Sequence, residues 1–209
     1  MIFIKLPELV LAIFIIFDIN QYQIMNFSTR SFCIALLGAT MLVFSQERNL
    51  RNIQKLTFGG DNAEAYFSPD GKKLTMQVTN PTIGAHCDQI YLLDLNQKNI
   101  STKDLNLIST GTGRTTCSFF MPDGKHILYA STHEANKECP PKPTPRSDGK
   151  YLWPIYEEFD IYEADLNGKI TRKFTDSPGY DAEAVVSPDG KYIVFTSTRS
   201  GDLELWRMD

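Results

Sequence analysis

Short segments in which apolar and polar residues alternate follow one another along the chain after residue 60. A period of two places successive side chains on opposite faces of a strand, so this alternation predicts β-structure. Turn-forming residues separate these segments at intervals of about eight to twelve residues, which is typical of all-β folds. The clearest segments are residues 73–78, 126–131 and 192–197. We therefore predict that this part of the chain is all-β.

Each of these three segments directly follows the same four residues, Pro-Asp-Gly-Lys. Proline presets φ for the first corner of a tight turn, and glycine adopts the positive φ that other side chains resist. Asp-Gly between two apolar runs is a strong hairpin signal. We predict three tight hairpins, with turn residues Pro69, Asp70 and Gly71; Pro122, Asp123 and Gly124; and Pro188, Asp189 and Gly190.

Each hairpin belongs to a longer repeat of four strands. In the first repeat we predict strands at 64–68, 73–79, 89–95 and about 106–109, and in the second at 116–121, 126–131, 159–165 and 169–175. The third repeat contains two strands around its hairpin and a third at 203–208. Four short strands in a repeat of some tens of residues are typical of a β-propeller blade.

The repeat resembles that of TolB-type, WD40-like β-propellers. The resemblance rests on an upstream Thr and Asp, the Ser-Pro-Asp-Gly-Lys turn, the alternating strand, and a Tyr-x-x-Asp-Leu-Asn corner at residues 91–96 and 162–167. Similar repeats occur in the propellers of tricorn-like and prolyl-oligopeptidase-like peptidases. The resemblance covers residues 52–209 and implies an incomplete β-propeller of two full four-stranded blades and three strands of a third, with a gene that continues past Asp209.

An isolated segment at 52–57 matches the fourth strand of a repeat, and we predict a strand there. In closed propellers of the kind that the chain resembles, such a first strand completes the last blade. The propeller domain is expected to span residues 46–209.

The second repeat contains a proline-rich insertion between its second and third strands. The insertion runs from about residue 133 to 158 and ends with three aromatic residues, Tyr151, Trp153 and Tyr156. Long loops on a rigid scaffold often carry binding functions, so these aromatic residues are candidates for ligand binding. The alternative is an ordered loop whose aromatic residues attach it to the blade.

Three carboxylates form a second candidate binding site. Glu64, Asp181 and Glu183 lie where the first strands of two repeats begin. In a propeller these strands line the central channel, so the three side chains are expected at its mouth, where they would bind a cation or a basic segment of a partner. The alternative is that they cap backbone amides at the strand ends.

The first 45 residues have a different character from the repeats. Two apolar runs occur at 9–17 and 31–44, and both are shorter than the roughly 20 residues that a membrane span needs. Residues 25–45 have the anatomy of a secretory signal peptide, with Met25 at the start, Arg30 before the apolar core and a small residue, Ser45, at the cleavage site. Residues 1–24 are then an over-extended reading frame or, alternatively, an anchor. We expect a periplasmic or otherwise exported protein without a membrane span in the mature chain.

Export makes disulfide bonds possible. Cys87 and Cys117 each begin a predicted strand on the same face of the propeller, so we predict a bond between them and leave Cys139 unpaired. Two alternatives are free thiols and a metal site formed by Cys87, His86, His133 and Cys139, although no closely paired ligand spacing supports a metal.

Composition and motifs exclude several functions. The net charge of −4 and the absence of a basic stripe argue against a nucleic-acid partner. The sequence has no Gly-x-Ser-x-Gly nucleophile motif, no zinc-protease motif and no complete calcium loop, and we predict neither cofactor nor metal. A propeller lyase would need a histidine-rich metal site, and the chain has three histidines.

The resemblance implies a non-catalytic scaffold in the cell envelope that binds envelope proteins or peptides. The alternative is the substrate-gating propeller of a prolyl-oligopeptidase-like or tricorn-like serine peptidase whose catalytic domain lies outside these 209 residues.

Overall fold

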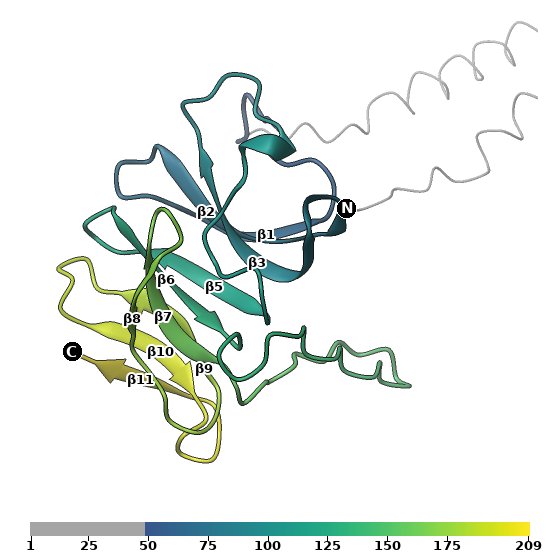
Figure 1. Cartoon of the computed structure of the whole chain (residues 1–209), viewed down its shortest axis with the longest axis vertical. Helices are drawn as coiled ribbons and strands as arrows, with labels where there is room; N and C mark the ends of the chain where they lie inside the picture. The colour runs from purple at the N-terminus through teal and green to yellow at the C-terminus, as the bar shows by residue number, and fades with distance from the viewer. Residues whose placement is uncertain (1–48) are drawn as a thin grey trace, which may run out of the picture. The chain divides into compact units, whose positions relative to one another are not determined.

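The computed structural model describes residues 49–209, and all of its strands belong to one compact unit, Gln54–Asp209 (Figure 1). The predicted over-extended start at 1–24 and signal peptide at 25–45 lie outside the described residues. Among residues 49–209, no helix has the length and apolar character needed to cross a membrane.

The described chain forms three antiparallel sheets in succession. The first sheet contains β1 (Asp61–Phe67), β2 (Lys73–Asn80), β3 (Ala85–Asp94) and β4 (Asn106–Leu107), in that order. The second contains β5 (Thr115–Phe120), β6 (His126–Ser131), β7 (Asp160–Asp165) and β8 (Ile170–Lys173), and the third contains β9 (Asp181–Val186), β10 (Ile193–Ser197) and β11 (Glu204–Met208). Two short 3-10 helices, η1 (Pro81–Ile83) and η2 (Thr102–Asp104), interrupt the first sheet. The predicted all-β fold of consecutive blades is confirmed.

The three hairpin turns have the predicted conformation. In each turn the glycine N–H donates to the carbonyl three residues earlier, from Gly71 to Ser68, from Gly124 to Met121 and from Gly190 to Ser187, at 2.8–2.9 Å. Each of these glycines has φ between 65° and 73°. The aspartate accepts from the backbone of the following lysine in all three copies. Local sequence therefore determines these turns.

The second turn compensates for its different first residue. In the first turn, the Ser68 hydroxyl accepts a hydrogen bond from the Lys73 amide at 2.9 Å. Met121 has no hydroxyl, and the equivalent amide, that of His126, donates to Asp123 Oδ1 at 3.2 Å instead. The His126 ring also contacts Asp123, with Nδ1 2.6 Å from Oδ2. One aspartate thus replaces the missing serine.

The sheets pack face to face through two apolar clusters. Ile90, Leu92 and Ile108 of the first sheet pack against Ile127 and Tyr129 of the second. On the opposite face of the second sheet, Leu128 and Ile161 pack against Ile193 and Phe195 of the third. Leu128 and Ile161 have no solvent-exposed surface. Strands β6 and β7 contribute apolar side chains to both clusters. The second sheet is therefore buried on both faces between the first and third sheets.

The predicted strand at 52–57 is wrong. No strand is present in residues 49–60, because a strand requires a hydrogen-bonded partner and none of the described strands pairs with this segment. Leu56 instead packs against an apolar cluster on the first sheet that includes Leu74, Met76 and Leu93. The segment therefore covers one face of the first sheet instead of extending its edge.

Candidate functional site

The first strands of the three sheets share an irregularity at equivalent positions. Strands β1 and β9 each contact β5, and each of the three strands is bulged so that two of its residues face one residue of the neighbouring strand. The first residue of each bulge is Glu64, Cys117 or Glu183, with φ of 49°, 52° and 58° respectively. Bulges redirect side chains and are frequent next to functional sites. Here the three redirected side chains line one hollow of about 270 Å³.

The structure therefore brings together two of the three predicted carboxylates. Glu64 and Glu183 lie on either side of Cys117 in this hollow, which Asp181 does not line. Asp181 is 1% exposed and pairs with Arg199, with Oδ2 2.8 Å from Nη2. The predicted role of Glu64 and Glu183 in binding stays a prediction, whereas Asp181 has an internal partner.

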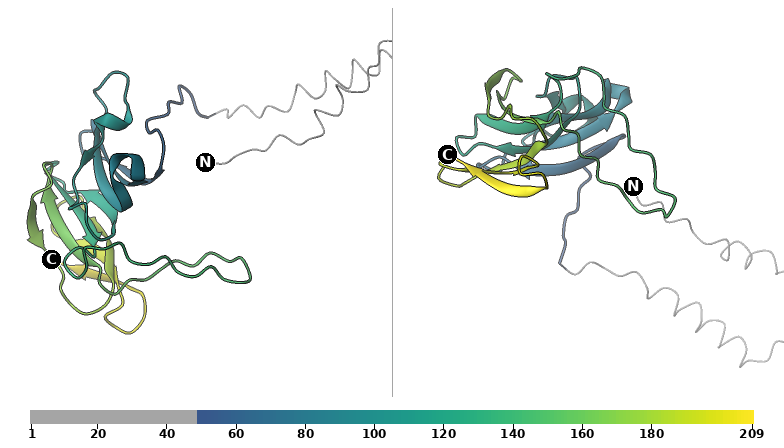
Figure 2. Two further views of the ribbon diagram at one scale, coloured as in Figure 1. Left: turned by 45° about the vertical axis from the view of Figure 1, so that its right-hand side comes forward. Right: turned by 90° about the horizontal axis from the view of Figure 1, so that it is seen from below.

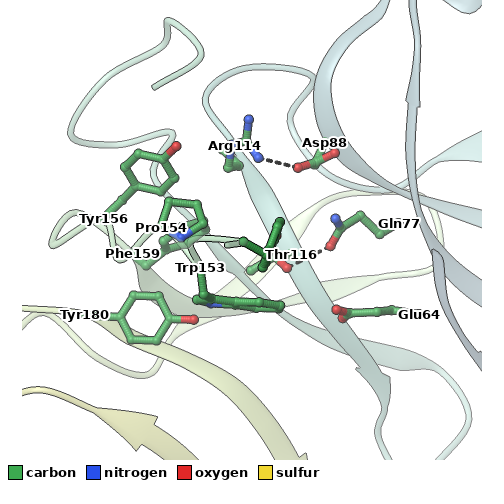
Figure 3. Close-up of a pocket in the computed structure, with 11 residues that line it drawn as sticks. Glu64, Gln77, Asp88, Arg114, Thr116, Trp153, Pro154, Tyr156, Phe159 and Tyr180 are labelled. Carbon is green, nitrogen blue, oxygen red and sulfur yellow. Dashed lines mark hydrogen bonds and ion pairs between the residues drawn. The ribbon is translucent and has the colours of Figure 1, made fainter. Parts of the chain in front are cut away.

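A second cavity of about 100 Å³ shares Glu64 with the first and lies against the insertion (Figure 3). On the strand side it is lined by Glu64, Gln77 and Thr116, and the Thr116 hydroxyl donates to Gln77 Oε1 at 2.7 Å. On the insertion side it is lined by Trp153, whose ring extends between Tyr180 and Glu64 in Figure 3. The two sets of residues predicted as separate sites thus meet at one cavity.

An ion pair that the sequence did not indicate forms another wall of this cavity. Arg114 Nη1 lies 2.5 Å from Asp88 Oδ2, and the Asp88 carboxylate also accepts from the Thr79 hydroxyl. The Arg114 guanidinium lies over the Tyr156 ring, 5.6 Å from its centroid. Both partners of the ion pair are more than four-fifths buried. Asp88 lies on β3 and Arg114 directly before β5 of the next sheet, so no local sequence motif could reveal the pair.

The three aromatic residues of the insertion have different roles. Tyr156 attaches the loop: its hydroxyl donates to the Pro141 carbonyl at 2.9 Å, and its ring packs 6.1 Å from that of Phe159. Tyr151 is 81% exposed and Trp153 is 54% exposed, and their rings contact each other edge to face. Attachment to the blade, which we considered as an alternative to binding, therefore applies to Tyr156. Tyr151 and Trp153 remain available to a ligand.

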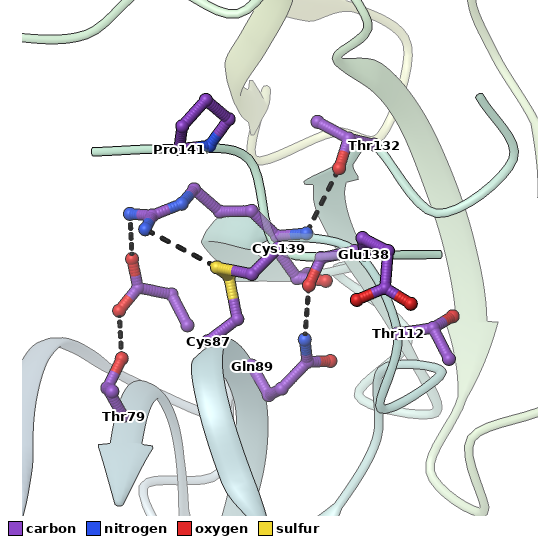
Figure 4. The surroundings of a disulfide bond; sticks show 12 residues. Thr79, Cys87, Gln89, Thr112, Thr132, Glu138, Cys139 and Pro141 are labelled. Atoms are coloured by element: carbon purple, nitrogen blue, oxygen red, sulfur yellow. Dashed lines mark hydrogen bonds and ion pairs between the residues drawn. A yellow bond between two sulfur atoms is a disulfide. The ribbon is translucent and has the colours of Figure 1, made fainter. Parts of the chain in front are cut away.

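A disulfide bond joins the insertion to the first sheet, but it is not the predicted one. Cys87 of β3 is bonded to Cys139, with Cα atoms 5.7 Å apart, and Cys117 is free (Figure 4). The predicted Cys87–Cys117 bond is wrong because Cys117 is the bulge residue of β5 and not its first residue, so its side chain lines the hollow beside Glu64. Cys87 and Cys139 were also the two cysteine ligands of the metal site considered as an alternative, and the disulfide engages both of them. Among the described residues, no group of histidine, cysteine and acidic side chains is arranged to hold a metal ion.

Hydrogen bonds support the same attachment. The Gly113 amide donates to the Lys137 carbonyl at 2.7 Å, and Gln89 Nε2 donates to the Gly113 carbonyl at 2.9 Å. These contacts surround the disulfide and hold the start of the insertion beside β3, while its remainder extends from the sheets as a long loop (Figure 2). The disulfide and these hydrogen bonds therefore fix the start of the insertion, whereas Tyr156 attaches its aromatic end.

Burial changes the acidity of two groups near these cavities. The pKa of the Cys117 thiol is raised well above its usual range, mainly by burial and further by the Glu64 and Glu183 carboxylates. Burial likewise raises the pKa of Tyr180, whose hydroxyl lies 3.4 Å from Glu183 Oε1. Both groups are therefore neutral near pH 7, and the charge of the hollow comes from its carboxylates.

No protein-family model matches the chain. A curated relative, the uncharacterised protein Atu1656 of Agrobacterium fabrum, is 36% identical over 147 residues, which cover 70% of this chain and 40% of the relative. The chain therefore spans less than half the length of this relative.

Solved β-propeller structures are similar over about three quarters of the chain. A putative TolB from Agrobacterium tumefaciens is 23% identical with a TM-score of 0.47, and the match covers 73% of this chain and 45% of that one. TolB from Acinetobacter baumannii is 23% identical with a TM-score of 0.49, covering 72% and 30% of the two chains. A puromycin hydrolase is 18% identical with a TM-score of 0.48, covering 75% and 23%.

Proposed function

We propose that this chain is part of an exported, non-catalytic β-propeller that binds a protein or peptide of the cell envelope. The observation that carries the proposal is the meeting of Glu64, from the first strand of one sheet, with Trp153 of the insertion at one cavity. Exposed aromatic residues beside polar groups are characteristic of recognition surfaces. The binding site comprises this cavity and the adjoining hollow between Glu64 and Glu183.

The disulfide supports the exported location. Disulfide bonds persist in oxidising compartments such as the periplasm and are rare in the cytosol. The Cys87–Cys139 bond joins the insertion to β3 across 52 positions of the sequence, so it has a structural role. The predicted signal peptide is consistent with this location.

The chemistry of the cavities supports binding over catalysis. Cys117 is the thiol that lines the hollow, and its raised pKa disfavours the reactive thiolate. Among the described residues that line the hollow or the cavity, no histidine accompanies it as a base. The peptidase-propeller alternative would place catalysis in a separate domain.

The proposal can be tested by crosslinking the full-length protein to partners in envelope extract. We expect the same partner to be captured by the wild type and by the control Leu107→Ala, which removes a side chain that is 42% exposed on β4 and lines neither the cavity nor the hollow. Trp153→Ala should abolish the capture. Equal capture by all three proteins would contradict the proposed site. Labelling of the full-length gene product by an active-site probe for serine hydrolases would favour the peptidase alternative.

A further inference from the structure

We infer that the cavity between Glu64, Trp153 and Tyr180 binds an ammonium group, carried by a lysine side chain or by the amino terminus of a peptide. This inference rests on the proposed function, because it names the chemical group of the partner that enters the site. It depends on three properties of the cavity: its uncompensated charge, its free aromatic faces and its size.

The charge of the cavity is negative. Arg114 is the cationic side chain in its wall, and Asp88 neutralises it through the 2.5 Å ion pair. Glu64 has no ion-pair partner among the described residues, and neither has Glu183, whose carboxylate accepts from the hydroxyls of Thr196 at 2.6 Å and Tyr180 at 3.4 Å. An entering cation would therefore meet unpaired carboxylates.

An anionic ligand is disfavoured by the same groups. It would face the Glu64 carboxylate, and Arg114 is already committed to Asp88 and to the Tyr156 ring. Two lysines of the insertion, Lys142 and Lys150, line a neighbouring hollow and not this cavity. Like charges placed opposite each other cost free energy, so the cavity selects against carboxylates and phosphates.

Aromatic faces add attraction for a cation. An ammonium group within about 6 Å of an aromatic ring is attracted to the face of the ring, and tryptophan gives the strongest effect. The described cation–π contact at this site uses Tyr156, whereas no described cation lies over the rings of Tyr151, Trp153 or Tyr180. Trp153 therefore presents a free face beside the free carboxylate of Glu64.

The size of the cavity suits a small chemical group at the end of a longer ligand. Its volume of about 100 Å³ is several times the roughly 10–15 Å³ that one water molecule needs. An ammonium group with its adjoining methylene fits this volume, and the adjoining hollows leave room for the rest of a peptide. The remainder of a peptide would lie across the exposed Tyr151 and Trp153 side chains.

Calorimetric titration of the full-length protein with small probes tests the inference. Nα-acetyl-lysine methylamide presents a side-chain ammonium, alanyl-alanine amide presents an amino terminus, and Nα-acetyl-norleucine methylamide has a similar shape without charge. We expect one of the two cationic probes to bind at least about tenfold more tightly than the norleucine probe, a difference of about 1.4 kcal/mol. Which of them binds identifies the source of the ammonium group.

Matched variants assign the binding to the cavity. Glu64→Gln should weaken the affinity for the cationic probe about tenfold. Asp176→Asn removes an exposed carboxylate that lines neither the cavity nor the hollow, and it should leave this affinity unchanged. Trp153→Leu should also weaken binding, and Trp153→Phe should retain most of it. Because Trp153 is more than half exposed, the two Trp153 variants should fold normally, which a thermal melt would verify.

The outcomes separate this inference from the proposed function. Three outcomes would overturn the ammonium site. The norleucine probe would bind as tightly as the cationic probes, Glu64→Gln would leave the affinity unchanged, or neither cationic probe would show saturable binding. Partner capture that depends on Trp153 but not on Glu64 would overturn it and leave the scaffold function standing. Glu64-dependent binding of a cationic probe without any captured partner would support the ammonium site and contradict the scaffold function.

Discussion

At the scale of single residues, the most informative positions are the three bulge residues. Glu64, Cys117 and Glu183 adopt positive φ although none of them is glycine. The left-handed conformation costs an ordinary residue about 1–2 kcal/mol, so the bulges are maintained against a local preference. Their common consequence is that three side chains face one hollow. The same conformation removes Cys117 from the reach of Cys87.

The conformational cost at Glu64 can be measured by substitution. Asparagine tolerates the left-handed region, whereas a β-branched side chain does not. We predict that Glu64→Val unfolds at lower denaturant concentration than Glu64→Asn, with a difference in the free energy of unfolding of about 1–2 kcal/mol. Both variants lose the same charge, so the loss of the carboxylate does not contribute to the difference between them. Equal stability of the two variants would show that the bulge relaxes readily.

The raised pKa of Cys117 predicts low reactivity. Alkylation requires the thiolate, and a pKa raised by burial leaves less thiolate at pH 8 than an ordinary cysteine has. We predict that iodoacetamide modifies Cys117 at least about tenfold more slowly in the folded protein than in urea, as followed by mass spectrometry. Rapid labelling of the folded protein at neutral pH would contradict the burial of this thiol.

At the scale of elements, the hairpin turns and the insertion follow different rules. Each turn is stabilised by residues within it, such as Asp123, which accepts from the amides of Lys125 and His126. The insertion has little regular structure, and it is held by Tyr156 and the disulfide. The turns were therefore predictable from four residues, whereas the course of the insertion depends on the surface that it meets.

The second hairpin should have a pH dependence of its own. The hydrogen bond to Asp123 raises the pKa of His126 above its usual value of about 6.5. Because the folded-state pKa is raised, the stabilising contribution is complete below about pH 6.5 and is lost as the pH rises through the higher folded-state value. The pair is largely exposed, so the contribution should stay below about 1 kcal/mol.

NMR titration can test this contact directly. We expect the His126 ring to titrate above His133, whose pKa is lowered mainly by burial. Asp123→Asn should return the His126 pKa toward 6.5 and leave His133 unchanged. If His126 titrates at the same pH in both proteins, the ring does not pair with Asp123 in solution.

The disulfide should control both stability and the position of the insertion. We predict that Cys139→Ser lowers the free energy of unfolding by about 2–4 kcal/mol, because a long closed loop is released in the unfolded chain. Hydrogen exchange should then increase in residues 139–156, which lose their attachment to β3. Cys117→Ser is the matched control, since it removes a free thiol and should retain the protection of the insertion. A loss of stability in Cys117→Ser but not in Cys139→Ser would instead support the Cys87–Cys117 pairing predicted from sequence.

At the scale of the whole described unit, stability comes from the packing of one sheet on the next. Ile127 belongs to the cluster between the first and second sheets, and Phe195 to the cluster between the second and third. Because the second sheet contributes to both clusters, a cavity on one of its faces should weaken the entire unit. The cavity beside Glu64 and Thr116 lies at the first strands of two of these packed sheets, so its geometry depends on the same contacts.

A truncation series at Ile127 tests this dependence. The side chain is fully buried, so Ile127→Val should cost about 0.5–1.5 kcal/mol and Ile127→Ala about 2–5 kcal/mol. Fluorescence and circular dichroism should report a single coincident unfolding transition in both variants. Separate transitions by the two probes would indicate that the sheets unfold independently.

The sequence by itself determined the strands, the hairpins and the class of fold. Period-two alternation and Pro-Asp-Gly turns act over a few neighbouring residues, so they operate wherever the chain lies. Even the substitution of Met121 for serine left its turn intact, because Asp123 within the same turn supplied the missing acceptor. Glu64, Glu183 and the insertion aromatics were also identified as candidates from sequence, but as two separate sites.

Only the tertiary structure decided how these candidates meet. The bulge conformation at Cys117, the bond between Cys87 and Cys139, and the Arg114–Asp88 pair each depend on contacts between residues of different sheets or loops. The segment 52–57 matches the fourth strand of a repeat in sequence, yet it forms no strand because it has no pairing partner among the described strands. The partner of a cysteine or charged residue, the burial of a side chain and a left-handed backbone conformation all depend on which residues lie nearby in space. The pattern of residue types along the chain does not specify those neighbours.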